Sequence, residues 1–197
     1  LVVGRVVGLA MACALAGGIY LSGALVVPAV AIPVVTTAAW ILVATSLALA
    51  AVALWPQVPR RSLAPLEGPA TKLPGRLGRW GGGLLRFTLR LLDALGQTAR
   101  RGWRPLAEAS GWALAGHVVV ASGITLAAVA MGMTPTWAGV VFTYTTSTAG
   151  TVLLFLFPGC QLGWDVSFGA LLTLTAGLTA SDAAAVMVLV RLQHSLV

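Results

Sequence analysis

Apolar stretches long enough to cross a lipid bilayer are the feature of this sequence that most restricts its fold. They occupy residues 6–27, 29–55, 105–131 and 134–157. A membrane-spanning helix needs about 20 mostly apolar residues, because a helix rises about 1.5 Å per residue and the hydrocarbon core is roughly 30 Å thick. Only 9% of the residues are charged, whereas soluble domains carry about 25%. The sequence therefore predicts an all-α, polytopic integral membrane helical bundle, placed in the inner or plasma membrane of the cell.

A fifth apolar stretch, residues 166–180, is too short to cross. Its length corresponds to about 22 Å of helix. It follows Pro158 and Gly159, which break a helix, and it ends before Ser181 and Asp182. Irregular backbone is tolerated at membrane depth only where protein or water surrounds it. We therefore expect the fourth and fifth stretches to be broken or re-entrant helices, followed by a last helix that Ser181 caps and that carries Asp182 in its first turn.

Positive charge is concentrated between the second and third stretches. Ten of the twelve Lys and Arg residues lie between Arg60 and Arg104, and the net charge is +7. Cytoplasmic loops of membrane proteins carry an excess of Lys and Arg, and basic segments beside a bilayer attract anionic lipid. We therefore expect residues 56–104 to lie in the cytoplasm and to contact lipid, and we expect no nucleic-acid partner.

This basic segment has two parts. Residues 56–83 are rich in proline and glycine and predict a surface loop, whereas residues 84–101 predict an amphipathic helix. One face of this helix carries Leu84, Thr88, Leu91 and Leu95, and the other carries Arg86, Arg90, Asp93 and Gln97. A basic amphipathic helix is typical of the membrane interface. It serves either as a connector or as a surface that binds lipid headgroups.

The fourth stretch is unusually rich in hydroxyl groups. We expect Thr134 to cap its helix and Pro135 to occupy the first helical position. Near its middle, residues 143–148 are five hydroxyl-bearing Thr and Ser residues and one tyrosine, with Thr146 and Ser147 among them. Such side chains either pack helices tightly or line a polar cavity. The sequence leaves both interpretations open, and the second makes Thr146 and Ser147 candidate substrate-binding residues.

Asp165 and Arg191 are the main candidate site residues, together with Pro158 and Gly159. Arg191 is the sole Lys or Arg in residues 105–197, and ionisable groups inside a membrane are costly and usually functional. Asp182 lies nine positions from Arg191, on the opposite face of the last helix. We therefore predict an ion pair between Asp165 and Arg191. The alternatives are that Asp165 only caps a helix and that Arg191 only extends to the interface.

Motifs typical of enzymes are absent from the sequence. No glycine-rich phosphate loop precedes a lysine, and no two histidines have metal-ligand spacing. We therefore predict a protein that is not an enzyme and needs no cofactor or metal. We expect three regions: two transmembrane helices in residues 1–55, the basic segment 56–104, and a transmembrane helix followed by broken helices in residues 105–197.

Pro158, Gly159 and Asp165 also carry a resemblance to a known family. The chain resembles the membrane domain of the lysylphosphatidylglycerol synthase family, also called flippase-like, which has a Pro-Gly-Gly-x-Gly-x-x-Glu loop. Gly177 and Arg191 are similar to later positions of the family pattern. Cys160 and Leu162 replace two loop glycines, and aspartate replaces glutamate at position 165. The resemblance covers roughly residues 56–197 and implies lipid translocation beside a polar cavity at mid-membrane.

These observations predict a protein that binds a polar-headed, anionic lipid or moves it between leaflets. Two other functions fit the same residues. One is that of a non-catalytic structural subunit whose partners are other membrane proteins of a larger complex, which the small size of the chain favours. The other is that of an ion-coupled transporter of small molecules that uses His117, within the third stretch, together with Asp165.

Overall fold

The computed structural model describes residues 2–66, 68, 75–154 and 160–195, and all structural statements concern these residues. Within them the secondary structure is helical throughout, which confirms the all-α class. Three helical segments, at residues 3–21, 29–54 and 104–130, are long and apolar enough to cross a membrane. These segments indicate a membrane-embedded protein.

The helices follow one another with short connections. They are α1 (Val2–Leu21), α2 (Ile32–Leu54, preceded by a 3₁₀ turn at Ala29–Ala31), α3 (Gln57–Leu63, followed by a 3₁₀ turn at Ala64–Leu66), α5 (Gly75–Arg100), α6 (Arg104–Ala130), α7 (Trp137–Leu154), α8 (Cys160–Thr175) and α9 (Ala180–Ser195). The α2 helix has Pro33 in its first turn, where the missing N–H of proline costs nothing.

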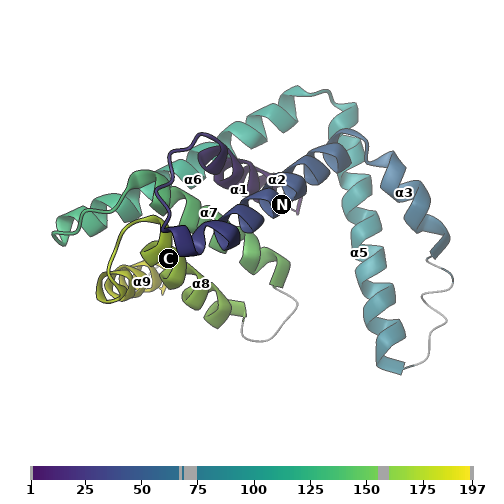
Figure 1. Ribbon diagram of the computed structural model, residues 1–197. Helices are drawn as coiled ribbons and strands as arrows, with labels where there is room; N and C mark the ends of the chain where they lie inside the picture. Colours follow the sequence, from purple (N-terminus) through teal and green to yellow (C-terminus); the bar gives the residue numbers. More distant parts are fainter. Residues whose placement is uncertain (1, 67, 69–74, 155–159, 196–197) are drawn as a thin grey trace.

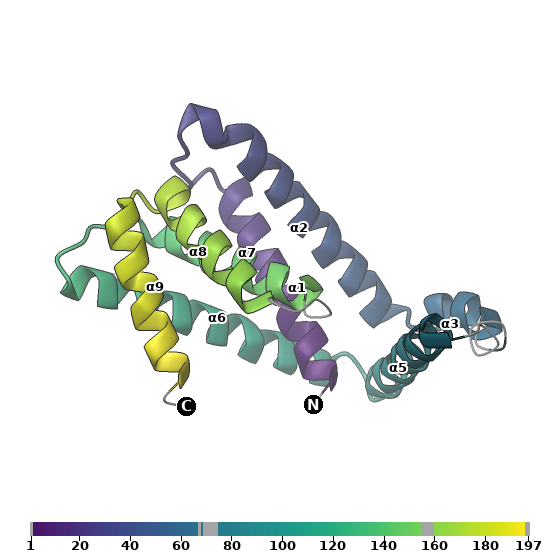
Figure 2. The ribbon, with the colours of Figure 1, turned by 90° about the horizontal axis from the view of Figure 1, so that it is seen from below.

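Helix α7 lies in the middle of the bundle, in contact with α1, α6 and α8 (Figure 2). On one side its Phe142 and Ala149 join a cluster built with α1 and α2. On the other side its Val140 joins a second cluster built with α6, α8 and α9, which includes Phe168 and Leu172. Because α7 contributes to both clusters, it connects the two halves of the protein.

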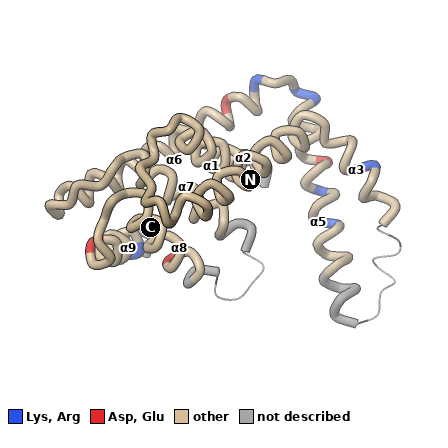
Figure 3. Tube along the Cα trace, viewed as in Figure 1, with Lys and Arg blue, Asp and Glu red and all other residues tan. Residues whose placement is uncertain are grey.

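Helices α3 and α5 extend away from the bundle (Figure 1). They follow the end of α2, and α5 leads directly into α6. The charged residues of the chain are concentrated here, on α3, α5 and the start of α6 (Figure 3). Along α5, Leu92 and Leu95 are buried whereas Leu84 is exposed. The half of α5 nearer the bundle is therefore packed, and the half farther from it presents apolar side chains outward.

The prediction of a loop at residues 56–83 is wrong over much of that range. Residues 57–66 form α3 and a 3₁₀ turn, and α5 begins at Gly75 rather than near residue 84. Pro59 is tolerated because it lies in the first turn of α3, where the N–H of a residue has no partner within the helix. Three successive glycines, residues 81–83, lie inside α5 although each weakens a helix by about 1 kcal/mol relative to alanine.

Helix α1 also ends earlier than the expected residue 27. It stops at Leu21, and Gly23 follows with a positive φ of 71°. The amide of Ser22 donates to the carbonyl of Gly18, and the amide of Gly23 donates to that of Tyr20. A glycine in this left-handed conformation terminates a helix readily because it has no Cβ. Apolar composition alone did not reveal this stop.

The later helices begin at residues other than those predicted. Helix α7 begins at Trp137, so Pro135 precedes it instead of occupying its first position. Thr136 lies just before the helix, and its carbonyl accepts from the amide of Val140. The proposed break at Pro158 and Gly159 lies outside the described residues. Helix α8 already includes Cys160, so Asp165 lies within the helix and does not cap it.

Candidate functional site

Helices α8 and α9 form a hairpin whose turn is held by local contacts. Gly177 adopts a positive φ of 76° in this turn, which suits a residue without a Cβ. At the start of α9 the hydroxyl of Thr179 donates to a carboxylate oxygen of Asp182 at 2.7 Å, and the amide of Asp182 donates back to the hydroxyl at 3.2 Å. Asp182 is in the first turn, as predicted, but the capping residue is Thr179 and not Ser181.

The opposite end of the hairpin is joined by the predicted ion pair. The Arg191 Nε donates to Asp165 Oδ1 at 2.7 Å, and a terminal nitrogen of Arg191 donates to Oδ2, also at 2.7 Å. This two-bond geometry is the strongest way for a guanidinium to hold a carboxylate. The side chains keep 37% and 21% of their surface exposed. A ligand outside the protein can therefore contact the ion pair, although both side chains are partly buried.

A stacked pair of aromatic rings lies beside Arg191. The Trp164 ring stacks on Phe168, with centroids 4.5 Å apart and planes inclined by 10°. The Arg191 guanidinium carbon lies 5.6 Å from the centroid of the Trp164 ring, within the range of cation–π attraction. Phe168 is fully buried, so the stack anchors the arginine to the core of the bundle. Trp164 was not among the residues predicted from the sequence, although its position beside Asp165 and four before Phe168 was a usable signal.

A groove runs along the hairpin from this ion pair. This α8–α9 groove has a volume of about 330 Å³. Its walls consist mainly of small or apolar side chains, among them Gly169, Ala170, Ala183 and Met187, and Asp165 lies at one end. Residues 165, 169 and 173 recur every four positions and so share one face of α8. The arrangement combines an apolar groove with a charged group, the carboxylate of Asp165, at its end.

Close backbone contact fixes α8 against α7 at the end of the hairpin near the turn. The Thr136 hydroxyl donates to the Thr175 carbonyl at 3.1 Å, and the Thr143 and Thr175 hydroxyls share a hydrogen bond of 2.9 Å. A Cβ on Gly139 would overlap the Thr175 carbonyl group, so glycine is required for this approach. Gly139 and Thr175 were not identified from the sequence, because their partners are more than thirty residues away.

The other predicted site residues are not joined to the ion pair by any contact seen in the described residues. Thr146 and Ser147 both lie on α7, and the Ser147 side chain is buried. The Thr146 hydroxyl oxygen is buried and has no hydrogen-bond partner among the described residues. The neighbouring hydroxyl of Thr145 donates to the Val141 carbonyl of its own helix at 2.7 Å. Pro158 and Gly159, also predicted here, lie outside the described residues.

His117 has a structural partner on another helix. Its Nε2 is 3.0 Å from the carbonyl oxygen of Gly8 in α1. Its ring centroid is 5.9 Å from that of Tyr144 in α7. The histidine therefore contacts both α1 and α7 from α6. Asp165, the other residue that the ion-coupled transporter hypothesis uses, pairs with Arg191.

Comparison of the chain with protein-family models, with curated proteins and with solved structures finds no match. The resemblance to the flippase-like family therefore stays a prediction drawn from Pro158, Gly159, Asp165, Gly177 and Arg191.

Proposed function

We propose that this protein is a polytopic membrane protein that binds a polar-headed, anionic lipid and carries it between leaflets. The observation that supports this most is the Asp165–Arg191 ion pair at one end of the apolar α8–α9 groove. A lipid has the same division into a charged head and an apolar tail. In this arrangement the headgroup phosphate contacts Arg191, and part of an acyl chain follows the groove.

The partner of Arg191 is suited to exchange. Asp165 is a carboxylate held by two hydrogen bonds from the guanidinium, and a phosphate offers the same planar fork of donors an equivalent set of acceptor oxygens. An incoming anionic headgroup can therefore replace Asp165 without leaving the arginine unpaired. The displaced Asp165 carboxylate, 21% exposed, must then be met by water or take up a proton, because an isolated charge away from water is costly.

The length of α8 supports a re-entrant placement. Helix α8 has 16 residues in the described part of the chain, which corresponds to about 24 Å, less than the hydrocarbon core of roughly 30 Å. We place the segments at residues 3–21, 29–54 and 104–130 across the membrane of the cell and the basic α3 and α5 on its cytoplasmic side. The hairpin then brings a charged pair into a region that the long helices cross.

Lipid retention by the purified protein tests the proposal. Native mass spectrometry after incubation with phosphatidylglycerol or phosphatidylcholine should show preferential retention of the anionic lipid. Arg191→Gln should lower that retention roughly tenfold, because it removes charge-assisted hydrogen bonds. Asp165→Asn should retain at least as much anionic lipid as the wild type, since it removes the acceptor that competes for the guanidinium.

The matched control is Arg104→Gln. Arg104 is exposed and pairs with Glu108 at the start of α6, so its loss changes the net charge equally without touching the groove. Equal retention of both lipids by the wild type, or equal losses from the Arg104 and Arg191 variants, would refute the proposed site.

A further inference from the structure

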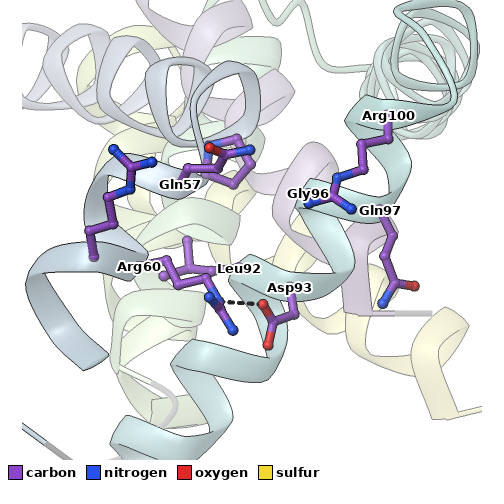
Figure 4. Close-up of a pocket in the computed structure, with 9 residues that line it drawn as sticks. Gln57, Arg60, Leu92, Asp93, Gly96, Gln97 and Arg100 are labelled. Carbon is purple, nitrogen blue, oxygen red and sulfur yellow. Dashed lines mark ion pairs between the residues drawn. The ribbon is translucent and has the colours of Figure 1, made fainter. Parts of the chain in front are cut away.

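A second hollow lies between α3 and α5, away from the hairpin. This α3–α5 hollow has a volume of about 480 Å³. Its polar lining consists of Gln57, Arg60, Arg61, Asp93, Gln97 and Arg100. Buried Leu92 and Pro56 also line it. Figure 4 shows Arg60 directed at Asp93, and the guanidinium of Arg100 extending over Gly96.

The charges around the hollow do not balance. Three arginines face one carboxylate, that of Asp93, which forms an ion pair with Arg60. The hollow therefore has a formal charge of +2. Both side chains of the pair are about half exposed, at 53% and 45%, and an exposed pair of this kind contributes little to stability. An anion entering the hollow can compete with Asp93 for Arg60 at small cost.

The helix dipole alone does not explain this cluster. Arg60 and Arg61 lie in the last turn of α3, and Arg100 lies in the last turn of α5, where cations are favourable singly. The dipole gives no reason for side chains from two helices to line one hollow that also has two amide groups and an apolar base. At Gly96 the wall of α5 approaches Pro56, because a Cβ built there would lie 3.7 Å from a ring carbon of that proline, in ordinary van der Waals contact.

We infer that the α3–α5 hollow binds a phosphate group in its monoester form. Such a group carries a charge of about −1.5 to −2 at pH 7 and three strong acceptor oxygens, which matches the excess charge and the several guanidinium donors. Glutamine amides can complete its hydrogen bonding. The same chemistry occurs in a lipid headgroup that ends in phosphate and in a soluble phosphate compound. This inference does not depend on the Asp165–Arg191 site.

Asp93 has a specific role in this account. It pairs with Arg60 while the hollow is empty of phosphate, so it competes with phosphate for the Arg60 guanidinium. Replacing it with asparagine preserves its shape and removes its charge. Asp93→Asn should therefore tighten phosphate binding, by about threefold or more, because one like-charge repulsion and one competing ion pair are lost. A residue with only a structural role in joining α3 to α5 would not have this effect.

Calorimetric titration of the full-length protein in an uncharged detergent tests the inference. The probes are inorganic phosphate and short-chain phosphatidic acid, each at constant ionic strength and against chloride. Arg100→Gln should weaken both by roughly tenfold. Arg90→Gln is the matched control, because Arg90 is an exposed arginine of the same helix that does not line the hollow.

The outcomes separate the two sources of phosphate. Saturable binding of both probes that depends on Arg100 supports a site for the phosphate group itself. Arg100-dependent binding of phosphatidic acid alone supports the same site in its lipid form. Absence of binding for both probes overturns the inference. Equal losses for the Arg90 and Arg100 variants also overturn it, since they would show a diffuse charge effect. Asp93→Asn binding no tighter than the wild type overturns the role assigned to Asp93.

Discussion

The guanidinium of Arg191 contacts two groups of the site: the carboxylate of Asp165, which lines the end of the α8–α9 groove, and the ring of Trp164. Reversing the charge at either end, with Asp165→Arg or Arg191→Asp, places two like charges together. Each single reversal should lower the free energy of unfolding by about 1–2 kcal/mol, a value reduced from that of fully buried pairs because the side chains are partly exposed. The double reversal should recover most of the loss.

Thermal unfolding in detergent measures this recovery. The comparison pair is Arg104–Glu108, whose side chains are 84% and 60% exposed, so reversing it should change stability little. Two independent losses at Asp165 and Arg191, without recovery in the double variant, would show that their interaction does not hold the hairpin together.

Gly139 provides a second test at the residue scale. Gly139→Ala forces α7 away from the Thr175 carbonyl, and overpacking of this kind typically costs about 1–3 kcal/mol. Gly123→Ala is the control, because a Cβ at this position in α6 meets no atom within 4 Å. The control should be neutral or slightly stabilising, since alanine favours a helix. A Gly139 variant as stable as the control in thermal unfolding would contradict the close approach of α7 and α8.

The sequence predicted the ion pair but not its surroundings. Arg191 stood out because charged residues are scarce in this part of the chain. Asp182 was excluded as its partner because the two lie on opposite faces of the last helix. Both inferences need only composition and spacing along the sequence. The bonds from Thr136 and Thr143 to Thr175 depend on how α7 lies against α8. Sequence spacing contains no information on that approach. Ser181 was predicted to cap the last helix, but Thr179, two positions earlier, is the cap. The error is local, because several hydroxyl residues lie close together here.

At the scale of the element, α5 divides into a packed half and an outward-facing half. Leu84 and Arg86 lie two positions apart, about 200° around the helix, and both side chains are exposed. If α5 lies in the membrane interface, a spin label at Leu84→Cys should collide mainly with oxygen, and one at Arg86→Cys mainly with a water-soluble relaxation agent. Cys13 and Cys160 are first replaced with alanine. Equal accessibility to water at both positions would place α5 outside the interface.

Helix boundaries were harder to predict than helix existence. The apolar stretches at residues 29–55 and 105–131 correspond closely to α2 and α6, because length and composition decide them. Residues 57–63 and 75–83 were misassigned because proline and glycine usually mark loops. Packing between α3 and α5 outweighs that local preference, and tertiary contacts of this kind cannot be read from propensity.

At the scale of the whole molecule, the two proposed binding regions lie on different parts of the fold. The α8–α9 groove lies on the hairpin that packs against α6 and α7, and the α3–α5 hollow lies between the helices that carry most of the positive charge. Helix α7 connects the halves through both hydrophobic clusters. The subunit hypothesis predicts a stoichiometric membrane-protein partner on purification in mild detergent, whereas the lipid-carrier proposal predicts a chain that retains lipid and acts without one.

Transport of a labelled anionic lipid in reconstituted vesicles tests the central proposal most directly. Fluorescent phosphatidylglycerol is placed in both leaflets, and a membrane-impermeant reductant bleaches the outer one. The protein should allow bleaching of the inner-leaflet lipid as well, the Arg191→Gln variant should do so far more slowly, and Arg104→Gln should behave as the wild type. Inner-leaflet fluorescence as well protected with the wild-type protein as in empty vesicles would contradict the account.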